Sequence, residues 1–296
     1  MFRFKNQQFE FTISGVRFGG QPGRRRTVMV GSMCYPRHTI IEDRTTGRCH
    51  AGSFERLLAL KSAAMEETST PGGVMLFAET AEAMEMHLRR AADITSMPLF
   101  IDSPSVDVRL VGARIAHEIG ISERVVYNSI TAGVSERELE AICDSGITAA
   151  VLLAFNPADL GVKGKIYLLE DGGGLLPSGL VELARKAGIT RPLIDTAVMA
   201  AEQGAGAALR AIIVSKAKWG LPSGCALHNA VESYSPLAAL KDEERKIYQY
   251  VDTASAIMPI MAGGDFVIYG PIEHARRACH AASFADEMME QAAADL

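Results

Sequence analysis

Short runs of hydrophobic residues alternate with helix-type patterns along most of this chain. The runs have strand character, and the segments between them carry apolar residues at helical spacing, as at Phe54, Leu57 and Leu58. The predicted strands are residues 27–32, 73–79, 99–102, 124–128, 148–156, 191–195, 224–229 and 265–270. Eight strand–helix units in strict alternation predict a parallel sheet closed into a (β/α)8 TIM barrel.

An open doubly wound sheet is the main alternative fold. It requires a Gly-rich dinucleotide fingerprint after the first strand, and VGSMCYPRH is not one. No Pro- or Ser-rich linker divides the chain, so residues 1–296 are predicted to form one barrel domain. Residues 4–18 alternate in polarity around a Ser14–Gly15 turn, which predicts a β-hairpin that, with its linker, occupies residues 1–23. We expect this hairpin to plug the amino-terminal end of the barrel.

Five of the hydrophobic runs end in a small polar cluster. The clusters are LFIDSPS with Asp102, RVVYNSI with Asn128, VLLAFNP with Asn156, PLIDTA with Asp195, and CALHNAVES with His228 and Asn229. A parallel barrel gathers the carboxyl ends of its strands at one rim, where the active site lies. The sequence therefore predicts one polar pocket rich in Asp and Asn, which suits a flat heterocycle bearing N–H and C=O groups.

Composition and charge exclude several classes of protein. A net charge of −5 argues against nucleic acid as a main partner, because basic patches mark such proteins. No apolar stretch is long enough to cross a bilayer, and the N-terminus lacks a signal-peptide hydrophobic region, so we expect a cytoplasmic protein without a membrane segment. The 5 cysteines show neither a CxxC motif nor zinc-type spacing, which predicts reduced thiols and no metal site.

Several motifs together resemble one known family. LFAETAEAME, IDSPSVDVRL, LLAFNPAD, LLEDGGG, KAKWGLPSG and AGGDFVIYGPIEHA are similar to the H subunit of tetrahydromethanopterin S-methyltransferase and its bacterial relatives, over nearly the whole chain. The resemblance implies a pterin-binding TIM barrel. It also implies methyl transfer between N5 of a reduced pterin and the cobalt of a separate corrinoid protein.

Two branches of this family differ in their pterin. The chain is slightly shorter than expected for the archaeal form, and ALHNAVESYSP is less Gly-rich than the archaeal sequences. We therefore expect a bacterial, tetrahydrofolate-using enzyme of a glycine betaine-type demethylation pathway. The alternatives are an archaeal-type tetrahydromethanopterin subunit and a non-catalytic docking subunit of a methyltransferase assembly.

The resemblance also implies partners. The chain lacks a DxHxxG cobalamin-binding motif, so the corrinoid must arrive on a partner protein. A long loop is predicted over residues 157–177, and its glycines would let it flex to admit that partner. The family implies a homodimer, with the Ala- and Met-rich HAASFADEMMEQAA segment as its interface unless that segment packs on the barrel.

The family pattern assigns roles to matching residues. Asp102, Asn128 and Asp195 are expected to hold the hydrogen-bonding edge of the pterin. Asn229 matches the residue placed near N5 and is the expected catalytic donor. For Asp102, Asn128 and Asp195, the alternative is a helix-capping role, which Asp and Asn both favour.

Three further residues complete the predicted pterin site. Asn156 is expected to touch the ligand or only to shape its loop, Ser129 to assist Asn128, and Glu79 to complete the rim unless it caps a helix or is solvated. His228 is expected to face away from the pocket, because successive residues of a strand point to opposite faces.

A Schiff-base aldolase is the competing barrel chemistry. It needs a lysine at the end of a strand. Lys165, Lys216 and Lys218 are predicted in loops or helices instead.

Overall fold

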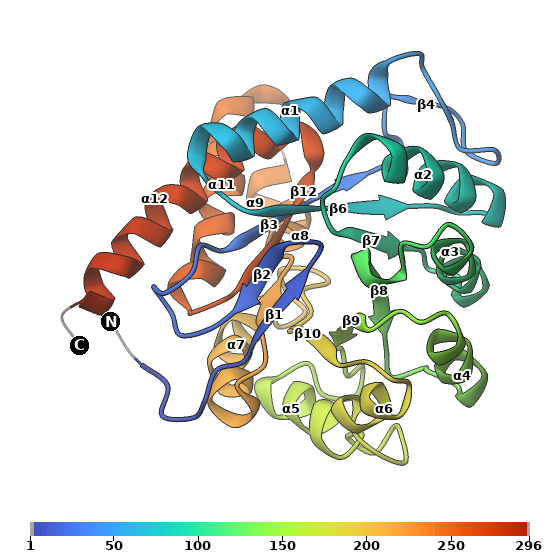
Figure 1. The fold of residues 1–296 in the computed structure, drawn as a ribbon. Coiled ribbons are helices and arrows are strands. Elements are labelled where there is room, and N and C mark those ends of the chain that lie inside the picture. Colours follow the sequence, from blue (N-terminus) through green and yellow to red (C-terminus); the bar gives the residue numbers. More distant parts are fainter. Residues whose placement is uncertain (1–2, 239, 295–296) are drawn as a thin grey trace.

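A closed parallel barrel forms the centre of the computed structural model, which describes residues 3–238 and 240–294 (Figure 1). Its strands are β3 (Val28–Met33), β6 (Gly72–Phe77), β7 (Leu99–Asp102), β8 (Val125–Ile130), β9 (Ala149–Leu153), β10 (Arg191–Asp195), β11 (Ser223–Cys225) and β12 (Phe266–Pro271). They follow one another around the barrel in chain order, and β12 closes it against β3. The predicted TIM barrel is confirmed.

Helices follow the strands and surround the barrel (Figure 1). They are α1 (Ser53–Thr68), α2 (Ala81–Ile94), α3 (Val106–Glu118), α4 (Glu136–Asp144), α5 (Val162–Glu170), α6 (Leu180–Lys186), α7 (Ala205–Trp219), α8 (His228–Ser233), α9 (Ser235–Ala238), α10 (Leu240–Glu243), α11 (Arg245–Met261) and α12 (Ala275–Ala294). Single 3-10 turns lie at η1 (Ser122–Arg124) and η2 (Ile272–His274). A two-stranded ribbon, β4 (Ile41–Asp43) and β5 (Arg48–Cys49), is inserted between β3 and α1.

The barrel strands are buried on both faces. Their inward side chains form one cluster that includes Val30, Phe100, Val126 and Leu193. The outward side chains pack under the helices, most of them in a second, larger cluster and the others in two smaller clusters. This two-sided burial explains why the strands read as nearly continuous hydrophobic runs in the sequence.

The predicted hairpin is present and closes one end of the barrel. Its strands are β1 (Glu10–Ile13) and β2 (Val16–Gly19), and in Figure 1 it lies across the centre of the ring of helices. Ile13 and Phe18 are fully buried in the inward-facing cluster of the barrel. The ring of Phe18 lies 6.5 Å from those of both Phe100 and Phe266. The hairpin is therefore the plug expected from the sequence.

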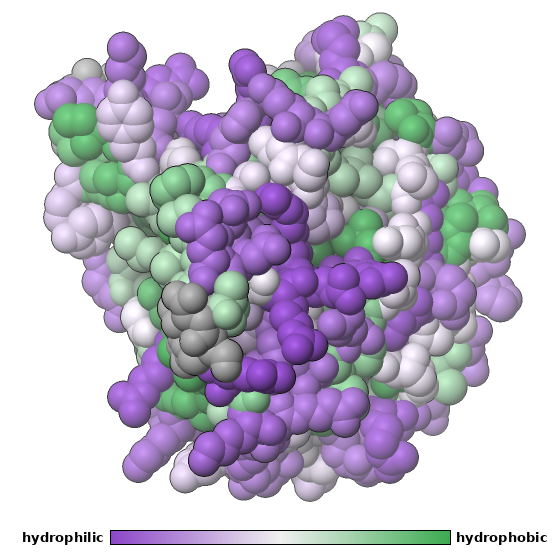
Figure 2. Space-filling view, turned by 60° about the vertical axis from the view of Figure 1, so that its left-hand side comes forward, coloured by the Kyte–Doolittle hydropathy of each residue, from purple (hydrophilic) through white to green (hydrophobic). Residues whose placement is uncertain are grey.

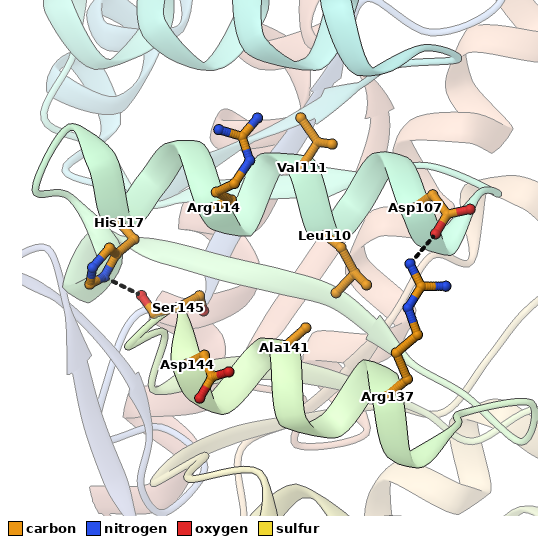
Figure 3. Close-up of a pocket in the computed structure, with 9 residues that line it drawn as sticks. All are labelled: Asp107, Leu110, Val111, Arg114, His117, Arg137, Ala141, Asp144 and Ser145. Atoms are coloured by element: carbon orange, nitrogen blue, oxygen red, sulfur yellow. Dashed lines mark hydrogen bonds and ion pairs between the residues drawn. The ribbon is translucent and has the colours of Figure 1, made fainter.

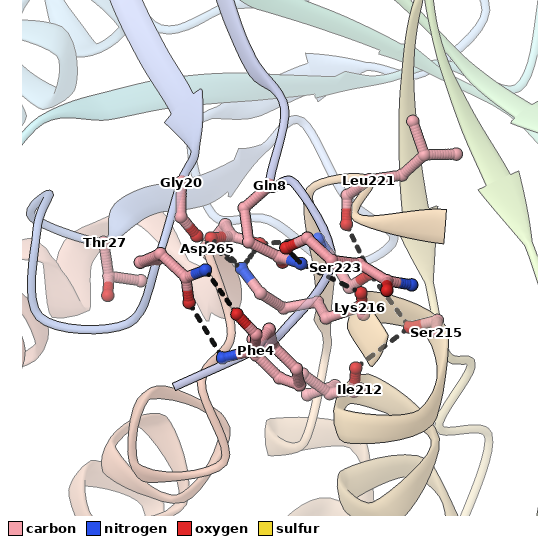
Figure 4. A network of polar contacts seen from close by, with 12 residues as sticks. Phe4, Gln8, Gly20, Thr27, Ile212, Ser215, Lys216, Leu221, Ser223 and Asp265 are labelled. Atoms are coloured by element: carbon pink, nitrogen blue, oxygen red, sulfur yellow. Dashed lines mark hydrogen bonds and ion pairs between the residues drawn. The ribbon is translucent and has the colours of Figure 1, made fainter. Parts of the chain in front are cut away.

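A buried ion pair ties this end of the barrel together (Figure 4). The Lys216 ammonium on α7 donates to both Asp265 carboxylate oxygens, at 2.5 and 2.7 Å, and to the Gly20 carbonyl at 3.0 Å. Asp265 also accepts from the Ser223 backbone N–H at 2.9 Å. Segments from the start, middle and end of the chain thus share one polar network beneath the strands.

The long loop predicted over residues 157–177 is wrong in part. Helix α5 occupies residues 162–170 of it and buries Ile166, Leu168 and Leu169. The apolar run of α5 is short and follows FNPADLG, so Gly and Pro signals mask its helical period. The glycines after it form a tight turn: Gly172, Gly173 and Gly174 all have positive φ, and the Gly173 N–H donates to the Asp171 carboxylate at 2.9 Å.

The outer surface is mostly hydrophilic on the face shown in Figure 2, with small hydrophobic areas between polar residues. The apolar face of α12 packs against the barrel and α1, with Ala278, Ala282 and Met289 buried, although Phe284 is exposed. Among residues 3–238 and 240–294, no helix combines the length and apolar character needed to span a membrane.

Candidate pterin site at the carboxyl rim of the barrel

Three of the predicted site residues face the barrel interior. Side chains alternate along a strand, and Phe100, Val126 and Leu193 belong to the inward-facing cluster. Asp102, Asn128 and Asp195 lie two positions after these residues, at or near the carboxyl ends of their strands. They therefore point into the barrel at the rim where a parallel barrel carries its chemistry.

Asp102 and Asn128 form a pair across neighbouring strands. The two residues are register partners in the β7–β8 ladder, and the Asn128 amide donates to Asp102 Oδ1 at 2.9 Å. Burial raises the pKa of Asp102 to about 6, although the Arg109 charge and the Asn128 hydrogen bond oppose this rise. The second carboxylate oxygen of Asp102 and the amide oxygen of Asn128 are acceptors for a ligand N–H.

Asp195 lies across β9 from this pair and is held by its own turn. Its Oδ1 accepts from the Ala197 N–H at 2.8 Å, and Ala197 has a left-handed φ of 56°. Burial raises the pKa of Asp195 to about 6, while the Ala197 hydrogen bond and the Lys165 charge lower it.

Lys165 fixes that turn from outside, a role that the sequence does not predict. Its ammonium, buried on α5, donates to the Ala197 carbonyl at 2.9 Å. Burial lowers the pKa of Lys165. The sequence pattern hides α5 and so places this lysine in a loop. The one sequence signal of its burial is that a charged residue stands directly before the apolar run IYLL. The Lys165 charge lowers the pKa of the Asp195 carboxyl and so favours its ionised form.

A buried network supports the Asp102 strand end from behind. Arg109 donates to the Ser103 carbonyl at 2.6 Å, to the Tyr127 hydroxyl at 3.2 Å and to Glu138 at 3.1 Å. The Tyr127 hydroxyl donates to the same Glu138 oxygen at 2.6 Å. Arg109 and Glu138 are 6% and 2% exposed, so each charge depends on the other for compensation.

Asn156 is engaged in its own loop. Its amide oxygen accepts from the backbone N–H groups of Ala158 and Asp159 at 2.9 and 3.3 Å, and its amide nitrogen lies 3.4 Å from the Gly164 carbonyl. The side chain is 3% exposed. Of the two expectations for this residue, the contacts favour the loop-shaping role.

Ser129 and Glu79 are placed very differently. Ser129 is buried next to Asn128 on β8. Glu79 lies between β6 and α2, is exposed, and pairs with Arg44 at 3.5 Å. Thr80, not Glu79, caps α2 by accepting from the Ala83 N–H at 3.1 Å. The structure thus puts Glu79 on the outer edge of the rim.

The strand predicted over residues 224–229 is wrong at its end. β11 stops at Cys225, and His228 and Asn229 begin helix α8. The expectation that they point to opposite faces of a strand therefore fails. The Asn229 amide donates to the Val198 carbonyl at 2.8 Å, which links α8 to the segment after Asp195. An amide has two N–H donors and an acceptor oxygen, so this one bond leaves Asn229 with capacity for a ligand.

His228 belongs to a second polar cluster that sequence reasoning missed. Its Nδ1 lies 3.4 Å from Asp252, and His274 Nδ1 lies 3.5 Å from the same carboxylate, which also binds Arg277. Burial alone would raise the pKa of Asp252, but the nearby His228, Arg277 and His274 hold it below its usual value. These residues line a cavity of about 210 Å³ between α8, α11 and the end of β12.

Another hollow, of about 480 Å³, lies on the outside of the barrel between α3 and α4 (Figure 3). Leu110, Val111 and Ala141 are among its apolar lining residues, and an exposed Asp107–Arg137 pair lies at one end with its atoms 3.1 Å apart. None of the predicted site residues lines it. The hollow is therefore separate from the candidate site at the rim.

Comparison with known proteins decides the family. The family model described as the tetrahydromethanopterin S-methyltransferase MtrH subunit matches residues 6–296. The chain belongs to this methyltransferase family. The H subunit of tetrahydromethanopterin S-methyltransferase from Methanothermobacter marburgensis is 40% identical over 296 residues, which cover 100% of this chain and 96% of that protein. The H subunit of the putative methyltransferase mtx from Methanosarcina barkeri is 37% identical, with the same coverage.

Solved structures support the barrel fold. A Yersinia pestis dihydropteroate synthase with a pterine–sulfa conjugate has a TM-score of 0.63 and 14% identity, covering 97% of this chain and 100% of that one. Dihydropteroate synthase from Thermus thermophilus has a TM-score of 0.64 and 15% identity, covering 95% and 100%. At such identities the likeness concerns the barrel alone.

These relatives bear on the two branches of the family. The small length difference from the M. marburgensis protein removes one reason for preferring the tetrahydrofolate branch. That protein is named for tetrahydromethanopterin, whereas we expected tetrahydrofolate and a glycine betaine-type pathway from the sequence. The family resemblance seen in the sequence is confirmed.

Proposed function

We propose that this chain transfers a methyl group between N5 of a tetrahydromethanopterin-type reduced pterin and the cobalt of a corrinoid carried by a partner protein. The observation that carries the proposal is the inward-facing trio Asp102, Asn128 and Asp195 at the rim. Family membership and the names of the relatives support the reaction class and the pterin type.

The trio suits the edge of a pterin. That edge presents an amino group, a ring N–H and a carbonyl, and two carboxylates with one amide supply matching acceptors and a donor. Asn128 is already held by Asp102, and Asp195 by Ala197, so neither needs to be ordered when the ligand enters. Buried carboxylates without a ligand are unfavourable, which argues against a purely docking subunit.

The reaction moves the methyl group without its bonding electron pair. The N5–methyl bond breaks, its electrons stay on N5, and the reduced cobalt supplies the pair for the new cobalt–carbon bond. N5 then gains a proton from solvent. We propose that Asn229 donates a hydrogen bond to N5 as its charge changes, which stabilises the transition state more than the bound substrate. A neutral amide cannot supply the net proton.

A side-by-side titration tests the pterin. Calorimetry with methyl-tetrahydromethanopterin and methyl-tetrahydrofolate should show the tighter Kd for the former, followed by methyl transfer to cob(I)alamin. Tighter binding and transfer with the folate would restore the tetrahydrofolate branch. A folded protein that transfers methyl from neither pterin would instead support the docking subunit. The homodimer stays a prediction, which light scattering of the purified chain would check.

A further inference from the structure

Two cysteines and a histidine that are far apart in sequence meet beside the rim. The ligand atoms of Cys34, Cys49 and His87 all lie within 4.8 Å of one another. Their exposed fractions are 6%, 7% and 3%, so the group is enclosed by protein. The sequence shows no zinc-type spacing because the fold, and not a local motif, assembles the three residues.

Three separate elements supply these side chains. Cys34 follows β3 directly and has a left-handed φ of 61°, a conformation that non-glycine residues seldom adopt. Its backbone N–H donates to His38 Nδ1 at 2.9 Å, which holds this turn. Cys49 ends β5, and His87 lies in the middle of α2.

The His87 ring is oriented as a metal ligand would be. Its Nδ1 lies 3.1 Å from the Phe77 carbonyl, a backbone acceptor that fixes the ring and leaves Nε2 as the ligand atom. Nε2, however, lies 3.1 Å from the Gly47 carbonyl. A neutral imidazole has only one N–H, so one nitrogen lone pair faces a carbonyl oxygen. A cation bound at Nε2, about 2 Å from the ring, takes up that lone pair and requires the Gly47 carbonyl to turn away from the ring.

We propose that Cys34, Cys49 and His87 bind one zinc-class divalent cation through two thiolate sulfurs and the imidazole Nε2. Two soft sulfur ligands and one imidazole favour zinc over the oxygen-seeking cations. Binding displaces two thiol protons, so the dication and two thiolates leave no net charge in this enclosed place. A water takes the fourth position, in the hollow that Cys34 and His87 line together.

The bound ion would have a structural role, because it joins three elements of the fold. The ribbon of β4 and β5 contains few residues, and an isolated two-stranded ribbon is marginally stable. A metal joining Cys49 to Cys34 and His87 fixes the end of this ribbon against β3 and α2. The site is therefore structural, and its loss should loosen residues 34–52 without altering the barrel strands.

Metal uptake by the reduced protein tests the proposal. The purified full-length chain is stripped with EDTA under reductant and titrated with Co²⁺ and Zn²⁺. We expect about one equivalent of Zn²⁺ by mass spectrometry and, with Co²⁺, sulfur-to-cobalt charge transfer together with intense tetrahedral d–d absorption. Cys49→Ser and His87→Gln should each weaken binding by at least about tenfold.

The chain offers matched controls for these variants. Cys225→Ser changes a buried thiol and Cys143→Ser an exposed one, both outside the cluster, and neither should alter uptake. Wild-type protein that binds less than about a tenth of an equivalent overturns the proposal. So does equal loss of uptake in a control variant, or a Cys34–Cys49 disulfide whose reduction restores no metal binding. Circular dichroism shows whether each variant is folded. If a variant is unfolded, the titration of the wild-type protein with metal still tests the proposal.

Discussion

The Asn128 amide lies 2.9 Å from Asp102 Oδ1, between register partners on adjacent strands. If Asp102 accepts N–H groups of the pterin through its other oxygen, Asp102→Asn should raise the pterin Kd. A lost charge-assisted hydrogen bond of about 1.5–3 kcal/mol corresponds to roughly 10- to 150-fold. Calorimetry would measure the change. Asp107→Asn, on the exposed outer pair, is the control, and an equal effect there would contradict the assignment.

Pterin affinity should depend on pH near the raised pKa values of Asp102 and Asp195, both about 6. A protonated carboxyl loses acceptor capacity, so Kd should rise below pH 6 by up to about tenfold per pH unit for each carboxylate required. Asp102→Asn should remove the contribution of Asp102 to this pH dependence and leave that of Asp195. A Kd that is constant between pH 5 and 7 would argue against carboxylate recognition.

The same two carboxyls should make the folded protein more stable at low pH, although their protonation weakens pterin binding there. Their folded-state pKa values lie above the ordinary 3.8. The folded protein therefore holds protons that the unfolded chain releases, and the contribution of these groups to the free energy of unfolding falls as pH rises from about 4 to 6. Urea unfolding of wild type and Asp195→Asn across this range would show it, because the variant should lack its share of the slope.

Asn229→Ala should slow methyl transfer far more than it weakens binding. Removing one donor from a developing charge typically costs about 10²- to 10³-fold in rate, whereas Asn229 is not among the residues assigned to the pterin edge. Single-turnover transfer to cob(I)alamin, measured beside pterin Kd, separates the two effects. Asn156→Ala is a fitting comparison, since the Asn156 amide hydrogen-bonds within its own loop. This variant should lower the Tm while leaving the transfer rate of the folded protein intact.

Glu138→Ala should strongly destabilise the fold. It leaves Arg109 buried without its carboxylate, a loss of about 3–5 kcal/mol in the free energy of unfolding. Urea denaturation would measure it. Arg137→Ala breaks an exposed pair nearby and should cost less than about 1 kcal/mol. Comparable losses in the two variants would show that the buried Arg109–Glu138 pair contributes no more to stability than the exposed pair.

The hydrophobic runs were sufficient for the barrel and for placing Asp102, Asn128 and Asp195 at strand ends, because both depend on local period. The family resemblance, and not the local pattern, singled out these three from the five polar strand ends. Ser135 and Glu138, three residues apart in the spacing typical of a capping box, show the limit of local reasoning. Ser135 does accept from the Glu138 N–H at 3.2 Å, but the Glu138 carboxylate turns inward to Arg109 and Tyr127 instead of bonding back to the helix start.

The features that sequence reasoning missed depend mostly on contacts between residues far apart in the chain. The roles of Lys165 and of the Cys34–Cys49–His87 group appear only when separate elements are packed together. The end of β11 is misplaced by the sequence pattern because CALHN continues an apolar run while the backbone already turns into α8. No local pattern distinguishes a strand from a short helix over so few residues.

The pairing of β12 with β3 has a consequence for synthesis on the ribosome. The strand that follows the hairpin cannot find its second neighbour until almost the whole chain has emerged. Until then one edge of the nascent sheet stays open and can pair with other chains. Shortening the chain before residue 266 should therefore yield aggregates instead of a smaller barrel, and coexpressed chaperones should matter most during the last part of translation.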